Sequence, residues 1–528
     1  MSKRKENFQL ECVPVHQNKY AQKVTSGGVE LKNLSVEFAP RHAIKQIPLL
    51  EEYHFVPYHE ENILSKSNKK TLIKYIDVCS SIAKMTLELL GKNGDEISSI
   101  LKGSQLADYL STTSYLESQA DSHILLKSLC AIMDAVTDTD FTRHVESYVD
   151  RYLLERDLDV LSKTLVQEIP LRGVLDIVLE NIVPKKLKVA EVSNSSQPLC
   201  AKIIEVIQTN CLSANYSVAH SSLDLLDRGC LPSEMVDVFS WVPGSSLSFK
   251  DIDLFVMKYL NSSKEDHARL LRAASATIKD GGFIIVLEKT RLVPAEMFLS
   301  TIRKTTLPML SEPDLEQTFK ELKLRVICKK SDSLTSTLYL LRKVPVASYQ
   351  DAVIPIEVGK YEKWVTELKE QIVEVISQPI KSKRIWLVSE GTNCSGVIGL
   401  VNCLRLEPGG SSIRCVFISE EVSTLPKFNT QTQFYEEILA KDLTMNIFKT
   451  NSWGSYRHFE MSEGTQSIEM EHAYLNLLTR GNLSSLTWID SPLKYVTQSS
   501  DTLLCHVYYA PLNFKDVMLA TGKLSQSE

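Results

Sequence analysis

The first feature that could carry chemistry is a polar turn after an apolar strand, in the stretch KLKVAEVSNSSQPL. An acidic residue, Glu191, precedes the turn, and a helical pattern follows it. Units that bind a methyl donor or a dinucleotide in this way place glycine in the turn, because the backbone must approach the ligand closely. This turn instead carries Ser193, Ser195, Ser196 and Gln197. The sequence predicts a packed, ligand-free turn, and a binding site of unusual composition is the alternative.

A second turn that could hold a nucleotide contains Gly391, Gly396 and Gly399, in GTNCSGVIG. Its spacing differs from the T-G-x-x-x-G-x-G of short-chain reductases, and Gly396 and Gly399 are expected to let a helix pack close to its sheet. Such reductases also need a helix-borne Tyr-x-x-x-Lys, whose lysine lowers the tyrosine pKa for proton transfer. The pair with this spacing, Tyr339 and Lys343, lies on a predicted strand rather than on one helical face. We expect this turn to bind no NADPH.

Other catalytic constellations are missing from the sequence, which has no G-x-S-x-G elbow, Walker loop, H-E-x-x-H or C-x-x-C pair. Five histidines are unclustered, and each is expected to be a surface or core residue: His54, His59, His220, His267 and His458. The 11 cysteines are also scattered. Without a secretion signal they are expected to be reduced, mostly buried thiols of a cytoplasmic protein, and no metal site is expected.

Length and charge limit the classes of protein to consider. A chain of 528 residues is too long for one core and implies two to four domains. The net charge of −6, with both signs interspersed, argues against a nucleic-acid or anionic-membrane footprint. No apolar run approaches the roughly 18–20 residues that a membrane span needs. The N-terminus lacks the apolar segment of a secretory signal.

The elements that must position these residues follow from apolar periodicity. Residues 66–171 repeat apolar side chains at three- and four-residue spacing, which predicts a helical cap. Strands and helices alternate over residues 183–343, which predicts a mostly parallel sheet covered on both faces. The expected strands, of which the last two form a closing hairpin, cover residues 186–193, 215–222, 235–242, 252–260, 281–290, 323–330 and 336–343.

The flanking segments predict a second α/β unit and partial β-rich ends. From about Val346 to residue 450 the pattern is that of a Rossmann-like unit, and SYRHFEM suggests its outer strand. Residues 8–38 are predicted to form strands joined by a turn, and the last 40 residues a strand and the start of a helix. Residues 48–59 are one more strand candidate. If that strand pairs into the second unit's sheet, the first α/β unit is an insertion in the second.

The first α/β unit resembles a known fold. In ATIKDGGFIIVLEKT, a helix, the turn Asp280–Gly282 and an apolar strand are similar to the segment that enters the fifth strand of class I methyltransferases. The unit resembles the C-methylating domain of polyketide synthases, in the non-methylating form that animal fatty acid synthases carry. The resemblance implies a class I methyltransferase-like domain with a helical cap.

The same resemblance says which functional residues are replaced. Active domains bind the methyl donor at a G-x-G-x-G turn, and Ser193, Ser195 and Gln197 occupy those three glycine positions here. Asn261, in FVMKYLNSS, stands where the resemblance implies a histidine, and Glu288 stands about where it implies a glutamate. An amide cannot act as a general base, since it does not titrate near neutral pH.

Further phrases resemble animal, insect-like type I fatty acid synthases, in the order expected for that family. SGGVELKNLSVEFAPR is similar to the dehydratase exit, GTNCSGVIGLVNCLRLEPGG to the structural half of the split ketoreductase, and VYYAPLNFKDVMLATGKLS to the opening of the enoyl reductase. The resemblance implies four parts: a dehydratase tail and linker (1–45), a pseudo-methyltransferase (46–345), a truncated Rossmann-like pseudo-ketoreductase (346–485) and the start of an enoyl reductase (486–528).

The resemblance therefore implies a non-catalytic structural segment of a synthase that builds fatty acids from acetyl- and malonyl-thioesters with NADPH. The segment is expected to bind no cofactor, since NADPH and phosphopantetheine act elsewhere in the parent. Its expected partners are the neighbouring dehydratase, enoyl reductase and catalytic ketoreductase half, in a homodimer, with no nucleic acid and no membrane. An active S-adenosylmethionine-dependent C-methyltransferase domain of a polyketide-synthase-like enzyme is the alternative. Whether the 528 residues are a fragment or an independent protein stays open.

Overall fold

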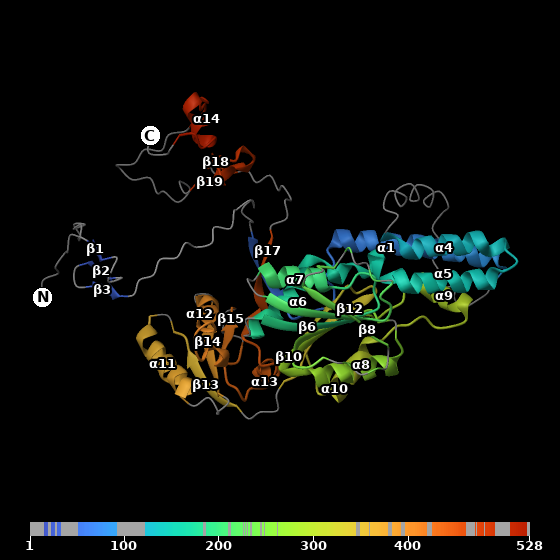
Figure 1. Cartoon of the computed structure of the whole chain (residues 1–528), viewed down its shortest axis with the longest axis horizontal. Coiled ribbons are helices and arrows are strands. Elements are labelled where there is room, and N and C mark those ends of the chain that lie inside the picture. Colours follow the sequence, from blue (N-terminus) through green and yellow to red (C-terminus); the bar gives the residue numbers. More distant parts are fainter. Residues whose placement is uncertain are drawn as a thin grey trace. The chain divides into compact units, whose positions relative to one another are not determined.

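The computed structural model separates the chain into two compact units, Glu52–Phe459 and a smaller one made of Met1–Glu51 with Glu460–Glu528 (Figure 1). Each unit is described by itself. The structure describes residues 15–18, 23–26, 29–32, 51–91, 122–182, 186–209, 213–224, 226, 229, 231–232, 235–242, 245, 247, 249–260, 262–344, 349–357, 359–377, 383–391, 396–419, 425–460, 470, 472–479, 481–491 and 507–524.

The larger unit contains an eight-stranded sheet in the order β5-β11-β12-β10-β9-β6-β7-β8. The strands are β5 (His59–Glu60), β6 (Lys186–Ser193), β7 (Ser213–His220), β8 (Val236–Ser240), β9 (Ile252–Lys258), β10 (Ile278–Lys289), β11 (Arg325–Ser331) and β12 (Ser336–Arg342). Only β12 runs antiparallel to its neighbours among these pairs. The seven predicted strands and their closing hairpin are confirmed. The fold is α/β, of the class I methyltransferase-like type.

Helices cover both faces of this sheet (Figure 1). On one face, α6 (Glu168–Asn181) and α7 (Cys200–Thr209) pack against strand residues such as Val189. On the other, α8 (Lys264–Thr277) and α10 (Glu312–Glu321) pack against the alternate residues, such as Ala190. Because successive side chains point to opposite faces, a doubly covered strand is a continuous apolar run.

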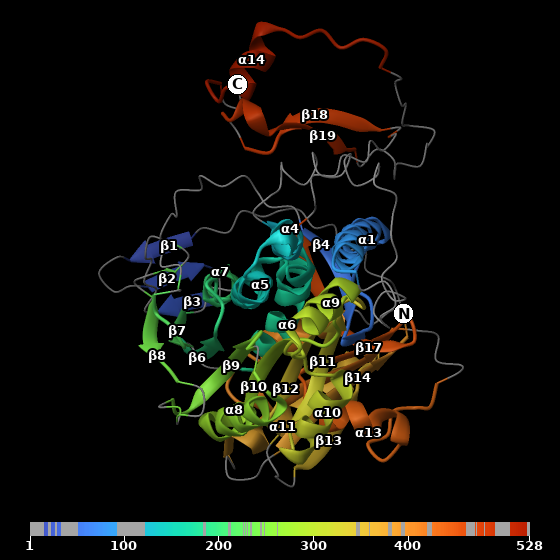
Figure 2. The same ribbon diagram turned by 90° about the vertical axis from the view of Figure 1, so that its right-hand side faces the viewer.

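The predicted helical cap is present in the part of residues 66–171 that the structure describes. Its helices are α1 (Lys66–Leu89), α4 (Ile124–Asp134) and α5 (Phe141–Glu155). A fourth helix, α9 (Pro294–Arg303), follows the sheet strand β10 in sequence yet shares the core of the cap through Phe298 (Figure 2). The cap is therefore built from helices that precede β6 in the sequence and from one helix that follows β10.

A six-stranded sheet of order β13-β14-β15-β16-β17-β4 forms the rest of the larger unit. Its strands are β4 (Glu51–Pro57), β13 (Gln350–Pro355), β14 (Lys383–Glu390), β15 (Ile413–Ile418), β16 (Met445–Lys449) and β17 (Ser452–Glu460). The helices α11 (Tyr361–Ser377) and α12 (Gly396–Leu404) share the core on one face, and α13 (Gln433–Ala440) lies on the other. The Rossmann-like unit is confirmed. The prediction that SYRHFEM is the outer strand is wrong, because β4 pairs beyond it.

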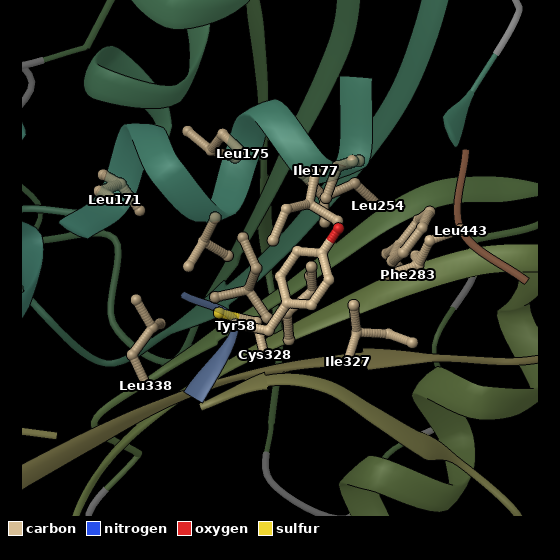
Figure 3. Close-up of a cluster of buried hydrophobic side chains, with 14 of the residues drawn as sticks. Tyr58, Leu171, Leu175, Ile177, Leu254, Phe283, Ile327, Cys328, Leu338 and Leu443 are labelled. Atoms are coloured by element: carbon tan, nitrogen blue, oxygen red, sulfur yellow. The ribbon is translucent and has the colours of Figure 1, made fainter. Parts of the chain in front are cut away.

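The position of β4 confirms that the first α/β unit is an insertion in the second. We call residues 58–344 the first module, and β4 with residues 349–459 the second module. Tyr58 lies between β4 and β5, where its N–H donates to the carbonyl of Trp453 at 2.8 Å and its carbonyl accepts from Lys329 N at 2.9 Å. Its ring lies among apolar side chains of the first module (Figure 3). The two modules therefore share one hydrophobic core.

One local prediction about the first module is wrong. The turn expected at Asp280–Gly282 is a bulge inside β10, where the register with β9 shifts between Ile278 and Phe283. Gly281 has φ +81°, and a Cβ on Gly282 would lie 3.0 Å from the Lys279 carbonyl oxygen. Glycine is needed at both positions, because Gly281 adopts a positive φ and Gly282 lies close to the backbone of its own strand.

The smaller unit contains short antiparallel elements. They are a sheet of β1 (Val15–Asn18), β2 (Lys23–Ser26) and β3 (Val29–Lys32), a hairpin of β18 (Ala473–Leu477) and β19 (Leu486–Asp490), and α14 (Phe514–Ala520). The strands predicted in residues 8–38 and the C-terminal helix start are thus present. The last predicted strand, in LLCHVYY, lies mostly outside the described residues.

Candidate functional site

The candidate site lies at the carboxyl end of β6, where the strand order of the first module reverses. β6 has β7 on one side and β9 on the other, and both pairs are parallel. Ligands of open α/β sheets bind in the crevice outside such a switch point. Here the Asn194 side-chain amide donates to the Leu260 carbonyl at 2.9 Å, which connects the turn after β6 to the segment after β9.

Glu191, the acidic residue before the turn, is fully buried and bound to its own fold. Its carboxylate accepts from the Leu199 N–H and from the Tyr216 hydroxyl, each at 2.8 Å. Burial raises its pKa, and these hydrogen bonds oppose that rise. The carboxylate therefore satisfies backbone donors at the start of α7, the place where a helix would otherwise receive an anionic ligand.

Ser193 and Ser195 fold the turn onto itself. The Ser195 N–H donates to Ser193 Oγ at 3.1 Å, and the Gln197 N–H donates to Ser195 Oγ at 3.0 Å. Both serine side chains are buried. Hydroxyls that accept from the backbone two residues on are typical of a self-contained turn.

Two charged side chains from distant elements fill the space over this turn. Ser195 Oγ donates to the carboxylate of Asp157, which lies in the short 3-10 turn Arg156–Leu158 after α5. Lys258, at the end of β9, donates to Asp157 Oδ2 at 3.1 Å, to Ser195 Oγ at 3.2 Å and to the Gln197 carbonyl at 2.7 Å. The charges are buried, but they are paired and hydrogen-bonded, as a buried ion pair must be.

His220, at the end of β7, completes the turn's contacts. Its Nδ1 accepts from the Ser222 N–H at 3.1 Å, so its Nε2 carries the proton and donates to the Ser195 carbonyl at 2.9 Å. His220 is a buried core residue, as predicted. The backbone groups of Ser195 and Gln197 are therefore engaged by the chain's own side chains.

The residue expected at the catalytic-base position, Asn261, lies outside the described residues. Glu288 lies near the end of β10, where its Oε1 accepts from Leu260 N at 3.3 Å. Burial raises the pKa of Glu288 to about 7. His267 is a buried core residue, as predicted, and its Nε2 lies 3.6 Å from Glu288 Oε1. Burial lowers the pKa of His267 to about 4.

Sequence reasoning missed three residues of this site: Asp157, Lys258 and His267. The sequence could have pointed to Lys258, since it is the one cation in the apolar strand IDLFVMKYL and a buried cation needs a partner. It could also have pointed to His267, six residues after Asn261 in the first turns of α8. Asp157 left no such signal, because it reaches the turn only through the packing of the cap on the sheet.

The second candidate turn, in the second module, is only partly described. Gly391, the residue after β14, has φ +99°, α12 begins at Gly396, and residues 392–395 lie outside the described residues. A Cβ on Gly396 or Gly399 would meet no atom within 4 Å. The expectation that these two glycines permit close helix packing is therefore wrong, since both face open space.

The tyrosine and lysine with reductase spacing bind separate partners. The Tyr339 hydroxyl donates to Glu316 Oε1 at 3.2 Å, and Lys343 Nζ donates to the Ile278 carbonyl at 3.2 Å. Their four-residue spacing thus produces no acid–base pair. Nor do the described residues contain a group of three or more His, Cys, Asp or Glu side chains placed to hold a metal ion. No described helix combines the length and apolar character needed to cross a bilayer.

Comparison with known proteins gives a family match within the second module. Residues 361–461 match the model of the fatty acid synthase pseudo-ketoreductase (pseudo-KR) domain. This stretch includes α11, α12, α13 and the strands from β14 to β17.

Among solved structures, the chain is similar to three methyltransferase structures. The trans-methyltransferase CalH, in complex with SAH, is 12% identical over 55% of this chain and 94% of its own, with a TM-score of 0.35. The DszA carbon methyltransferase is 13% identical over 56% and 100%, with a TM-score of 0.33. The citrinin polyketide synthase CMeT domain is 10% identical over 54% and 99%, with a TM-score of 0.30. Likenesses of this degree assign no activity to the chain.

Proposed function

We propose that the chain is a non-catalytic structural segment of a fatty acid synthase multienzyme of the animal, insect-like type. The observation that carries the proposal is the filled turn, in which Asp157, Ser195 and Lys258 bind one another where the family resemblance implies a methyl-donor turn. The pseudo-ketoreductase match over residues 361–461 supports the family. The proposal includes a cytoplasmic location, no bound cofactor, and a dehydratase and an enoyl reductase as neighbours.

The buried junction between the modules supports a scaffolding role. Arg457 of β17 forms an ion pair with Glu180 of α6, and one of its hydrogen bonds spans 3.0 Å. Arg342 of β12 donates to the carbonyls of Lys441 and Asp442 in the second module, at 3.1 and 2.5 Å. Together with Tyr58, these contacts fix one module on the other, which is what a segment that positions neighbouring catalytic domains requires.

An aromatic surface on the second module is the proposed contact for the catalytic ketoreductase half. Tyr53 of β4 stacks on Tyr456 of β17 with ring centroids 4.6 Å apart, and His458 lies at the same distance from Tyr53. Phe55 packs on the edge of Tyr456. Tyr53 is 48% exposed, on the face of the sheet whose core α11 and α12 share. A half-covered aromatic face of this kind suits docking to another domain.

The absence of cofactor binding is tested by calorimetric titration of the 528-residue chain with S-adenosylmethionine and, separately, with NADPH. The whole chain is used because the modules share a core. We expect no heat from either ligand at about millimolar concentration, because Asp157, Ser195 and Lys258 already bind one another at the first turn. Micromolar binding of S-adenosylmethionine would overturn the proposal.

The docking surface is tested with a separately produced catalytic ketoreductase half. We expect the chain to bind it, and Tyr456→Ser to weaken that binding at least about tenfold because it removes the centre of the stack. Tyr361→Ser is the matched control, since Tyr361 is an exposed tyrosine of α11 outside the aromatic surface. Equal effects of the two changes would contradict the assignment of this surface.

A second candidate function, a working C-methyltransferase, is favoured by one observation. The His267–Glu288 pair joins a neutral imidazole to a carboxyl whose pKa is about 7, a combination that can move a proton near neutral pH. The filled turn opposes this function, since chemistry without a methyl donor gives no methylation. Methyl transfer from S-adenosylmethionine to a β-ketoacyl thioester, lost in His267→Ala, would establish it over the structural proposal.

A further inference from the structure

The strand β8 lies at one edge of the eight-stranded sheet, with β7 as its neighbour on one side. In the part of the chain that the structure describes, no strand pairs with its other side. The Trp241 N–H, just after β8, donates to the His220 carbonyl of β7 at 3.0 Å. Backbone groups alternate between the two sides of a strand, so those of Asp237 and Phe239 also face β7. The residues whose N–H and carbonyl groups point away from the sheet are Val236, Val238 and Ser240.

This outer edge of β8 lacks the features that usually keep a sheet edge unpaired. Natural edge strands are often protected by lysine, proline or a β-bulge. β8 contains neither residue, and its register with β7 is continuous from Val236 to Ser240. Its one charge is that of Asp237, which is exposed and has no ion-pair partner among the described residues. The edge is therefore open to a further strand.

Apolar side chains lie beside the edge on both faces of β8. Phe239 is 46% exposed, and its ring packs edge-on against Phe249 with the ring centroids 6.3 Å apart. Met235, the residue before β8, is also exposed. A cavity of about 360 Å³ lies between α7 and the start of β8, where Ile207 and Met235 contribute to its lining. An added strand thus has apolar surface to cover next to the backbone groups that it would pair.

The charge of Asp237 indicates what kind of strand fits. The outward residues of two paired strands must face each other, so two copies of β8 would place both Asp237 carboxylates on one face of the pair. Like charges placed in this way are unfavourable, whereas a lysine or arginine opposite Asp237 forms a cross-strand ion pair. Phe239 points to the same face as Asp237, and an aromatic or β-branched residue packs well opposite it. The edge therefore suits a basic and apolar strand better than a second copy.

We propose that the outer edge of β8 binds an extended segment of a partner protein by β-strand addition. This segment carries a lysine or arginine opposite Asp237 and an aromatic or β-branched residue opposite Phe239. The outward backbone groups supply the hydrogen bonds, and the two side-chain pairs give the specificity. The interaction adds a partner on the first module to the structural function proposed above, and its failure would leave that function standing.

The test uses a fluorescently labelled peptide with lysine at its centre, valine two positions to either side and threonine elsewhere. Added to the 528-residue chain, it should show saturable binding by fluorescence anisotropy below about 1 mM. Two further peptides are N-methylated, one at the lysine and valine amides and the other at the threonine amides. Only one of these two sets of amides can face β8, so one peptide should lose binding and the other should keep it. Equal effects of the two methylations, or no binding at about 1 mM, would overturn the proposal.

Variants of the chain test the edge itself. Val238→Pro removes an outward N–H while the residues that pair with β7 keep theirs, so it should abolish peptide binding. Ser240→Pro makes the same change at an exposed position and should weaken binding without loss of apolar contacts. Urea unfolding confirms that both variants are folded. Peptide binding that survives in both folded variants would contradict the proposal. Self-association of the chain that Val238→Pro abolishes would instead identify a second copy as the occupant and overturn it too.

A charge reversal tests the ion pair. Asp237→Lys should weaken binding of the lysine peptide by about threefold or more and should favour a peptide with glutamate in place of lysine. Glu146→Lys is the matched control, because Glu146 is an exposed acidic residue of α5 in the cap. It should change the binding of neither peptide. If the two reversals had equal effects, the assignment of a basic partner strand to β8 would be wrong.

Discussion

The hydroxyl of Tyr58 donates a 2.5 Å hydrogen bond to the main-chain carbonyl of Met445, 387 residues further along the chain. Tyr58 stands where the chain leaves the sheet of the second module, and Met445 opens β16 of that sheet. The ring between these two points is buried in the core of the first module (Figure 3). The Tyr58 side chain thus connects the core of the first module to β16 of the second module.

Tyr58→Phe should destabilise the larger unit by about 1–3 kcal/mol, because it removes the donor and leaves the Met445 carbonyl buried without it. Urea unfolding should show a lower midpoint with an unchanged slope. Tyr53→Phe is the control, on the strand β4 that precedes Tyr58, since the Tyr53 side chain is 48% exposed. A midpoint that moves equally in both variants would show that the hydrogen bond adds nothing.

Lys258→Met should be among the most damaging single changes in the first module. It leaves the Asp157 carboxylate buried without its cation, and breaking a buried pair in this way costs about 3–5 kcal/mol. Lys264→Met removes an exposed ion pair with Asp314, which solvent screens, and should change stability far less. Thermal and urea unfolding measure both. Asp157→Asn added to Lys258→Met should recover part of the loss, and no recovery would mean that the charge is not the cause.

Glu288→Gln should change the pH dependence of stability. Burial raises the pKa of Glu288 from 4.5 to about 7, so the folded chain holds this proton more tightly than the unfolded chain. Its contribution is therefore fully present below about pH 4.5 and is lost as the pH rises through 7. The variant should be more stable than the parent by up to about 3 kcal/mol at pH 8, with the difference vanishing towards pH 4.5.

Urea unfolding at several pH values between about 5 and 8 would measure this difference. His267 acts in both proteins, since burial lowers its pKa to about 4 and its stabilisation is lost as the pH falls from 6.5 to 4. Glu296→Gln is the control of opposite sign. Burial alone would raise the Glu296 pKa, but Lys289 at 2.7 Å lowers it overall, so that variant should lose stability at pH 8. If the stability difference between Glu288→Gln and the parent did not change with pH, that result would contradict the raised pKa of Glu288.

Two alanine substitutions should act in opposite directions. Gly282→Ala places a Cβ 3.0 Å from the Lys279 carbonyl and should destabilise by about 1–3 kcal/mol through backbone displacement. Gly399→Ala faces open space on the exposed side of α12 and should stabilise by about 1 kcal/mol through helix propensity. Differential scanning calorimetry of both variants checks the pair, and a stabilising Gly282→Ala would refute the bulge.

The fold was readable from the sequence to the extent that it follows from local patterns. The strands of the first module, such as β9 and β10, are doubly covered and therefore form continuous apolar runs between helices. The sequence left open whether β4 pairs into the sheet of the second module, because its partner strand lies far away in the chain. The bulge at Gly281 and Gly282 was taken for a turn, because glycine marks positive φ in either setting.

The sequence shows that the turn is polar and has no glycine, but not which distant side chains contact it. The sequence itself shows Ser193 and Ser195 in the turn, where the family resemblance implies glycine. Lys258 and Asp157 come together across 101 residues of sequence, and Ser195 and Asp157 across 38, so only the packing of the cap on the sheet brings them to the turn. His267 and Glu288 meet in the same way, on a helix and a strand that are packed face to face.

The pairing of β4 with β17 has a consequence for the newly made chain on the ribosome. β4 ends at Pro57 and β17 begins at Ser452, so the partner strand is synthesised about 400 residues later, or about 20–80 s at typical elongation rates. During that interval β4, which carries Tyr53 and Phe55, has no partner strand to pair with. An unpaired strand edge is prone to aggregation, and a slowed ribosome between the two strands prolongs that exposure.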